Sequence, residues 1–415
     1  MRARSVSGWA AVVWLGVVLA AGPAQAQEAK DGERYIVLAW NSLGMHCYSR
    51  DFSDLAILPP YNTLWAQVIK VGEPVRIVTA GIVVEYSFPE NTYSALRADK
   101  PDKTNFWKYA KKLFGADLAP DTGLAGKGLR GTMDPAGDHF IAEGIPLTEY
   151  SDGDVTAEER STWKRHPYQL ATIVVKDVHS GTELCRTRVV APVSNELNCA
   201  TCHSDEGIAT TGNAIAPTGR PAANILALHD KLNSREYKTP LMEQRPVLCA
   251  GCHASAALGA KGKPGIPNLS NAMHRRHKDV KEITPDTAGC YRCHPGSMTQ
   301  CLRDTMSANF RLNCTTCHGT MDNVARNKSP WKNEPRCDNL ACHGPGYALD
   351  TPLYNQAKTK FGIYCAACHD SPHAIAPSRE ANDRIKFNDL QGEAGTLESC
   401  VVCHGTMPER PFRHK

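Results

Sequence analysis

The chain has 415 residues, of which 42% are hydrophobic, 22% charged and 7% aromatic. This is the composition of a globular protein, and it excludes a disordered or fibrous chain. The formal net charge is only +4, and no basic run with interleaved aromatic residues is present, so we do not expect nucleic-acid binding.

The first 26 residues have the pattern of a secretory signal peptide. Arg2 and Arg4 precede an apolar stretch from Trp9 to Ala21, and Ala24 to Ala26 form a small-residue cleavage site. The apolar stretch is shorter than the roughly 20 residues of a spanning helix. We expect cleavage, with an uncleaved anchor as the alternative. No later segment is apolar enough to cross a bilayer, so the mature protein is predicted to be periplasmic or extracellular.

Residues 27–195 are predicted to form an all-β domain, sandwich or barrel-like. The segments rich in Val, Ile and aromatic residues are Tyr35–Trp40, Leu64–Val71, Val75–Tyr86, Ala171–Lys176 and Glu183–Val190. The last two flank Asp177–Gly181, whose turn-forming residues predict a hairpin. Pro101–Pro146 is rich in Gly and Pro and is predicted to be a long loop.

Cysteines are distributed very unevenly along the chain. Only two of the 17 precede residue 196. After it, Cys-x-x-Cys-His occurs six times, and one wider site has two extra residues between its cysteines. In chain order, motifs 1 to 7 are Cys199, Cys202 and His203; Cys249, Cys252 and His253; Cys290, Cys293 and His294; Cys314, Cys317 and His318; Cys337, Cys342 and His343; Cys365, Cys368 and His369; and Cys400, Cys403 and His404.

This spacing is typical of covalent attachment of haem c. Two thiols on one short turn form thioethers with the two vinyl groups of haem, and the following His becomes an axial ligand of the iron. Zinc knuckles do not require a His after every second Cys, and disulfides do not explain the Cys-His pairs. We therefore predict seven haems c as cofactors, with fourteen cysteines attaching them and seven histidines coordinating iron. At motif 5 the alternative is a disulfide at Cys337 and a single thioether at Cys342.

Residues 196–415 are predicted to form a multihaem cytochrome c domain with short helices and much irregular structure. Helices are expected at Ala223–Leu232 and Asn271–Lys278. Aliphatic runs are too scarce for a side-chain core, so the haems must supply apolar surface. This part carries 26 Lys and Arg against 21 Asp and Glu, and several of these cations are expected to neutralise haem propionates.

Nine histidines lie outside the motifs and are candidates for the second axial position. We predict distal ligation by His229, His274, His277 and His373, with His274 and His277 one helical turn apart and serving two haems. The weaker candidates are His46, His139, His166, His179 and His414. Bis-His ligation suits electron transfer, whereas an open position suits substrate binding; Met ligation or an open iron remains for any haem without a second His.

Seven haems leave Cys47, Cys185 and Cys301 without a role. We expect a Cys47–Cys185 disulfide within the β domain. Cys301 is free, contacts a haem, or pairs with one of these two in place of that disulfide.

The second half of the chain resembles exported multihaem c-type cytochromes of extracellular and periplasmic respiration. The segments Gly289–Gly296, Cys301–Arg303, Leu43–Cys47 and Leu58–Asn62 resemble a subgroup with a β-rich N-terminal region. The resemblance implies electron transfer in anaerobic or extracellular respiration. It implies redox partner proteins, either other cytochromes or quinol-linked donors, and an outer-membrane porin complex or self-assembly as further associations.

Three functions are carried forward. The leading one is electron conduction along the haems, without a catalytic residue. The second is a reductase in which one open haem acts on a small nitrogen or sulfur compound. The third is a metal-ion or surface-adhesion role of the β domain.

Overall fold

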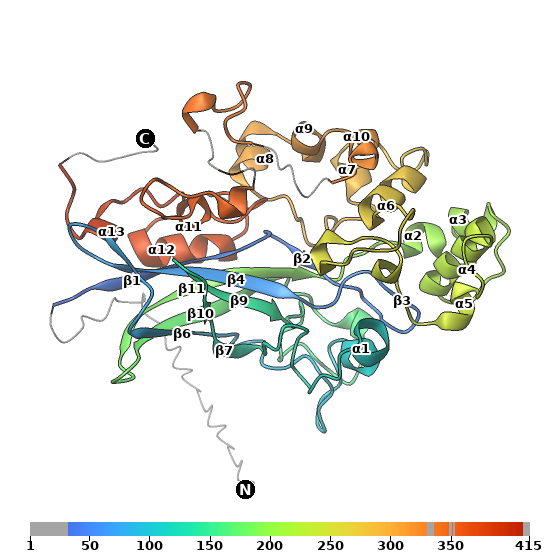
Figure 1. Cartoon of the computed structure of the whole chain (residues 1–415), viewed down its shortest axis with the longest axis horizontal. Coiled ribbons are helices and arrows are strands. Elements are labelled where there is room, and N and C mark those ends of the chain that lie inside the picture. Colours follow the sequence, from blue (N-terminus) through green and yellow to red (C-terminus); the bar gives the residue numbers. More distant parts are fainter. Residues whose placement is uncertain (1–31, 330–335, 348–350, 352, 410–415) are drawn as a thin grey trace, which may run out of the picture.

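The computed structural model describes residues 32–329, 336–347, 351 and 353–409 (Figure 1). The expected signal peptide and His414 lie outside the described residues. Among the residues described, no helix combines the length and apolar character that a membrane span requires.

Two curled β-sheets form most of the N-terminal region. The first has the order β1-β4-β9-β8, with β5 also paired to β4, and all its pairs are antiparallel. The second has the order β2-β11-β10-β6-β7, in which only the β2–β11 pair is parallel. The strands are β1 Tyr35–Asn41, β2 His46–Cys47, β4 Asn62–Lys70, β5 Arg76–Val78, β6 Ile82–Ser87, β7 Arg130–Thr132, β8 Asp134–Pro135, β9 Phe140–Ile145, β10 Tyr168–Asp177 and β11 Glu183–Ser194.

One hydrophobic core joins the two sheets, with β1 packed against β11. Along β10 the buried residues alternate, and Ala171, Ile173 and Val175 all face this core. Alternation follows from the two-residue repeat of a strand with one buried face. The predicted β10–β11 hairpin is confirmed.

The first sheet is buried on both faces. Ile36, Leu38 and Trp40 of β1 face away from the inter-sheet core and pack against Tyr364 and neighbouring residues. Figure 1 shows α11 (Cys365–His369), α12 (Ile385–Gln391) and α13 (Val401–His404) lying over this face of the sheet. The C-terminal motifs therefore rest on the N-terminal sheet.

The N-terminal region is rich in strands, as predicted, but it is not all-β, and the prediction of a loop over Pro101–Pro146 is wrong. This segment contains helix α1 (Phe106–Phe114) and strands β7, β8 and β9. Phe106, Ala110 and Leu113 of α1 are buried, and their spacing matches one face of a helix. Glycine and proline content concealed this periodicity.

Residues 199–329 consist of short helices and irregular segments. Both predicted helices are confirmed, as α4 and α6. The helices are α2 Ala200–His203, α3 Ile208–Thr211, α4 Pro221–Asn233, α5 Leu241–Gln244, α6 Leu269–His277, α7 Thr287–Cys290, α8 Thr305–Phe310, α9 Cys314–His318 and α10 Met321–Arg326. A two-stranded parallel pair, β12 (Val247–Leu248) with β3 (Leu55–Ala56), ties this part to the N-terminal region.

Candidate metal centres

The regular motifs fold into single helical turns. The backbone N–H of His203 donates to the carbonyl of Cys199 at 2.9 Å, and the equivalent bond recurs at His253, His294 and His404 with lengths of 2.9–3.0 Å. Motifs 4 and 6 form helices α9 and α11. Each turn therefore carries two thiols and one imidazole on five consecutive residues, as attachment to one porphyrin requires.

The second cysteines of motifs 1 and 2 lie within these turns. The backbone N–H of Cys202 donates to the carbonyl of Cys199 at 3.2 Å, and that of Cys252 donates to the carbonyl of Cys249 at the same distance. Both Cys202 and Cys252 are half-buried free thiols. The turns give each of them the placement that a thioether needs, whereas the predicted attachment of haem at Cys202 and Cys252 stays a prediction.

Motif 5 forms a comparable turn despite its extra residues. The backbone N–H of Cys342 donates to the carbonyl of Asn339 at 2.8 Å. The turn thus begins after Cys337, and the two added residues lengthen only the segment before it.

Four motif histidines each lie opposite a histidine from elsewhere in the chain. The ring centres of His203 and His277 are 6.3 Å apart, and those of His253 and His229 are 6.4 Å apart. The other two pairs are His294 with His274 at 6.1 Å and His318 with His373 at 6.0 Å. The second members of these pairs are the four predicted distal ligands.

These distances fit two imidazoles on opposite sides of one metal ion. A metal–imidazole bond is about 2 Å long, and a ring nitrogen lies about 1 Å from its ring centre, so two such rings have centres about 6 Å apart. Aromatic rings in direct contact have centres about 4.5–7 Å apart, so these separations also suit ordinary ring contact. The residues present therefore fit a bis-His haem iron, although ligation itself remains a prediction.

Two distal candidates on α6 have a hydrogen bond that orients the ring. Nδ1 of His274 lies 2.7 Å from the carbonyl of Ser270, and Nδ1 of His277 lies 2.7 Å from that of Met273. Such a bond keeps the proton on Nδ1 and leaves the Nε2 lone pair for a metal.

A tyrosine supports the distal candidate of motif 2 in the same way. Nδ1 of His229 lies 3.0 Å from the hydroxyl of Tyr237, which itself donates to Asp230 at 2.7 Å. Burial raises the pKa of this hydroxyl, and the nearby Asp230 and Cys252 raise it further. Tyr237 therefore lies beside both the distal histidine and a thiol of motif 2. Sequence reasoning missed Tyr237, because nothing in its spacing marks it.

Burial disfavours the charged form of three of the paired imidazoles. It lowers the pKa of His203, His294 and His373 to about 4, and the facing histidine adds to the effect in each case. A histidine must be neutral to coordinate a metal. The electrostatics thus agree with the ring geometry.

The other three motif histidines have varied surroundings. Nδ1 of His404 hydrogen bonds to the carboxylate of Glu73, which follows the first sheet's β4. The ring centre of His343 lies 5.3 Å from that of Tyr347. His369 ends α11, above the first sheet.

Four of the five weaker histidine candidates lie in the N-terminal region, and the fifth, His414, lies outside the described residues. His139 stacks on Trp65 at 4.5 Å, and His166 bonds to Asp154 at 2.7 Å. His179 lies in the exposed β10–β11 turn. His46 is buried on β2, and its Nε2 has no hydrogen-bond partner among the described residues.

Neighbouring thiols define the order of the first three motifs. Burial and the thiol of Cys199 raise the pKa of Cys249 to about 11. Burial, followed by the thiols of Cys199 and Cys202, raises the pKa of Cys293 to about 11. Motifs 2 and 3 therefore both adjoin motif 1.

The remaining motifs continue the series. The thiols of Cys290 and Cys314 hydrogen bond to each other, which places motif 4 next to motif 3. Burial and neighbouring groups that include Cys342 raise the pKa of Cys317, so motif 5 adjoins motif 4.

The last two motifs complete the order. The buried hydroxyl of Tyr354 lies near thiols of both motif 5 and motif 6. Burial and Cys368 raise the pKa of Cys403 to about 12, so motif 7 adjoins motif 6. The neighbouring thiols give the spatial order 2-1-3-4-5-6-7. Figure 1 shows the turns of motifs 1, 3, 4, 6 and 7 as α2, α7, α9, α11 and α13.

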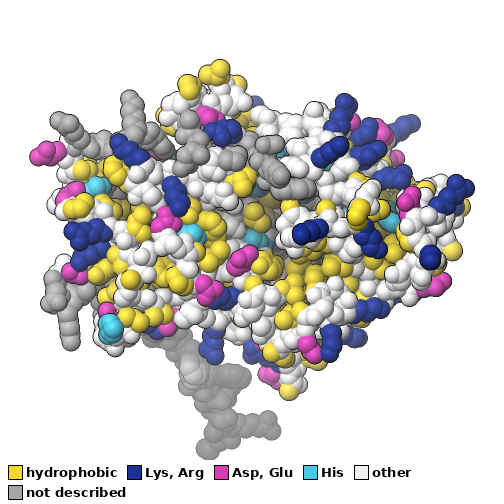
Figure 2. Space-filling model, viewed as in Figure 1, with side chains coloured by type: hydrophobic (Ala, Val, Ile, Leu, Met, Phe, Trp, Pro, Cys, Tyr) yellow, Lys and Arg dark blue, Asp and Glu magenta, His cyan; other side chains and the backbone are white. Residues whose placement is uncertain are grey.

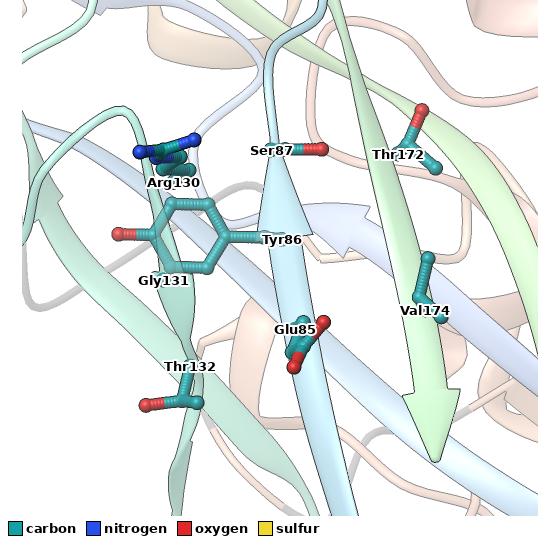
Figure 3. A pocket seen from close by; sticks show the side chains of 8 residues that line it. All are labelled: Glu85, Tyr86, Ser87, Arg130, Gly131, Thr132, Thr172 and Val174. Atoms are coloured by element: carbon teal, nitrogen blue, oxygen red, sulfur yellow. The ribbon is translucent and has the colours of Figure 1, made fainter. Parts of the chain in front are cut away.

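Other features of the structure do not form a competing centre. Within the described ranges, no three or more His, Cys, Asp or Glu side chains converge as a structural zinc site would require. An open hollow of about 380 Å³ lies on the second sheet (Figure 3). It is lined by Glu85, Tyr86, Ser87, Arg130, Gly131, Thr132, Thr172 and Val174, so it presents neither thiol nor imidazole.

The predicted Cys47–Cys185 disulfide is wrong. Cys47 pairs with Ser194 in the second sheet, whereas Cys185 lies nine residues earlier on β11 and faces the inter-sheet core. Nine residues of strand span about 30 Å. Strand register, which the sequence alone left open, therefore separates the two thiols.

Comparison of the chain with known protein families, curated proteins and solved structures gives no match.

Proposed function

We propose that this chain is an exported multihaem c-type cytochrome that conducts electrons along about seven covalently attached haems. The observation that carries the proposal is the set of four histidine pairs, each formed by one motif histidine and one distant histidine at 6.0–6.4 Å between ring centres. Four such pairs at four repeats of one attachment motif favour a common cofactor over unrelated packing.

Haem would supply an iron that accepts and releases one electron at a time. The motif cysteines would attach it, and each histidine pair would hold it through two neutral imidazoles. Two histidine ligands would saturate the iron, which would favour electron transfer over substrate binding. At motifs 1 to 4 the geometry therefore supports conduction more than the reductase alternative.

The continuous motif order supports a single path. Because each motif adjoins the next, electrons would enter and leave at the ends, near motifs 2 and 7. Figure 2 shows Lys and Arg side chains gathered around α4–α6, at the motif 2 end. Exposed cations of this part include Lys231, Arg235, Arg275 and Arg276, which suit haem propionates and an acidic face of a redox partner protein.

The proposal is tested on full-length protein made in a host that exports it and matures c-type haem. We expect haem to remain with the denatured chain, and the mass to account for seven haems, or six if motif 5 carries none. The oxidised electron paramagnetic resonance spectrum should be low-spin for at least four haems. A chain without covalent haem would overturn the proposal, and a dominant high-spin signal would favour the reductase.

Single variants of α6 test the ligand pairs. His274→Ala and His277→Ala should each convert one different haem from low to high spin, and the double variant should convert two. His179→Ala, in the exposed turn of the second sheet, is the control and should change nothing. Unchanged spectra in both α6 variants would contradict the pairing.

A further inference from the structure

The three cysteines outside the motifs have different surroundings. Cys185 is packed in the inter-sheet core, opposite Val175 of β10. Cys47 ends β2 and pairs with Ser194. Cys301 lies in the segment that follows motif 3, which reaches the same end of β11.

Two contacts hold the segments of Cys47 and Cys301 together. On one side, the hydroxyl of Ser194 lies 3.2 Å from that of Thr299. On the other, Nη1 of Arg303 donates to the carbonyl of Gly44 at 2.8 Å and to that of Cys301 at 3.1 Å. Two acceptors of one nitrogen lie within about 6 Å of each other, since each bond is about 3 Å long.

The Arg303 side chain that joins these segments is itself fixed. It is 1% exposed, and its guanidinium donates two bonds to Asp383, of 2.7 and 3.1 Å. A buried two-point ion pair of this kind leaves the side chain little freedom. The separation of the two segments is therefore set by the fold.

The electrostatics of the two thiols agree with this proximity. Burial raises the pKa of Cys47, and the thiol of Cys301 is the next cause that raises it further. Burial also raises the pKa of Cys301 to about 11.

We propose that Cys47 and Cys301 form a disulfide that joins β2 to the segment after motif 3. In this step two thiols lose two protons and two electrons as the S–S bond forms. The electrons reduce a disulfide oxidant of the export compartment to its dithiol, by thiol–disulfide exchange. Such compartments favour disulfides, and the bond would form before burial makes the thiols unreactive.

The bond would also position a ligand candidate. Sγ of Cys301 lies 3.6 Å from Nδ1 of His373, the histidine opposite motif 4. This consequence rests on the proposed function, whereas the bond itself does not. Motif 4 is the central motif of the spatial order. The disulfide would therefore fix the position of His373, the histidine opposite this motif, relative to the N-terminal sheets.

The test is alkylation and peptide mapping of the full exported chain, denatured without reductant. We expect Cys185 to be alkylated and the peptides containing Cys47 and Cys301 to appear joined. After reduction all three should be alkylated. Cys47→Ser should free Cys301 for alkylation without reductant, whereas Cys185→Ser, the matched control, should leave the joined peptides unchanged.

Alkylation of both Cys47 and Cys301 without reductant, or a joined peptide containing Cys185, would overturn the proposal. The same map reports the motif cysteines separately, as thioether-linked haem peptides or as alkylated thiols. Failure of haem attachment is therefore distinguishable from failure of the disulfide.

Discussion

The N-terminal sheets and residues 199–329 differ in what lies at their centres. The sheets enclose a continuous core of Val, Leu, Ile and aromatic side chains. In residues 199–329 the buried hydrophobic side chains are only Ala223, Leu226, Ala250 and Ala325. This segment nevertheless contains three of the four histidine pairs complete, and it supplies His318 to the fourth. Apolar side chains therefore contribute little to the interior of this segment, and we propose that haem supplies the apolar surface that it lacks.

The largest expected effect comes from withholding haem. The full chain produced without haem maturation should lose the fold of residues 199–329, because four buried hydrophobic side chains, three of them alanine, cannot offset the entropy of ordering this segment. Limited proteolysis should cleave this part and leave a fragment containing β1 to β11. Identical digestion of the haem-free and haem-bearing chains would contradict the prediction that residues 199–329 need haem to fold and the N-terminal sheets do not.

A core truncation in the sheets should destabilise the N-terminal region and leave the haem spectrum unchanged. Ile173→Ala removes a fully buried side chain from β10 and should lower the free energy of unfolding by about 2–5 kcal/mol. Val174→Ala, on the half-buried other face of the same strand, should cost less. Urea unfolding followed by circular dichroism measures both. A changed haem spectrum in Ile173→Ala would show that the regions are not energetically separate.

A buried carboxylate should give the N-terminal region a pH dependence. Burial raises the pKa of Glu149 to about 7 from its usual 4.5, against the opposing charge of Arg165. Between these values the unfolded chain releases a proton that the folded chain keeps, so stability falls as pH rises from 4.5 to 7. The loss is at most about 3 kcal/mol.

Glu149→Gln should remove most of this dependence, measured as the free energy of unfolding at pH 5 and pH 8. Glu143→Gln, an exposed carboxylate of β9, is the control and should retain the wild-type profile. An equal pH dependence in Glu149→Gln and wild type would exclude Glu149 as its source.

The smallest expected effect is at the junction of the two regions. Gly44 has φ +76°, and a Cβ there would lie 1.7 Å from the carbonyl oxygen of Pro372, next to His373. Gly44→Ala should therefore displace this loop and cost about 1–3 kcal/mol. Gly81 has φ +75° and open space around it, so Gly81→Ala shares the backbone strain without the collision. Only Gly44→Ala should alter the haem spectrum, and equal spectra would show that the loop adapts.

The sequence alone predicted the features that depend on local spacing. The motif turns need only five neighbouring residues, the β10–β11 hairpin needs two alternating segments and a turn, and α4 and α6 follow from helical periodicity. The four distal histidine candidates were chosen from nine by their local helix or loop context, and their ligation stays a prediction. Short-range geometry is encoded in residue order, so these features can be predicted without knowing the fold.

Tertiary structure decided what depends on contacts between distant residues. It determined which motif histidine each distant histidine faces, the motif order 2-1-3 where the chain order is 1-2-3, and the separation of Cys47 from Cys185. It also placed β9 beside β4, inside a segment whose glycines and prolines predicted a loop. Strand register and the packing of one element on another set these relations, and neither is fixed by the spacing of residues along the chain.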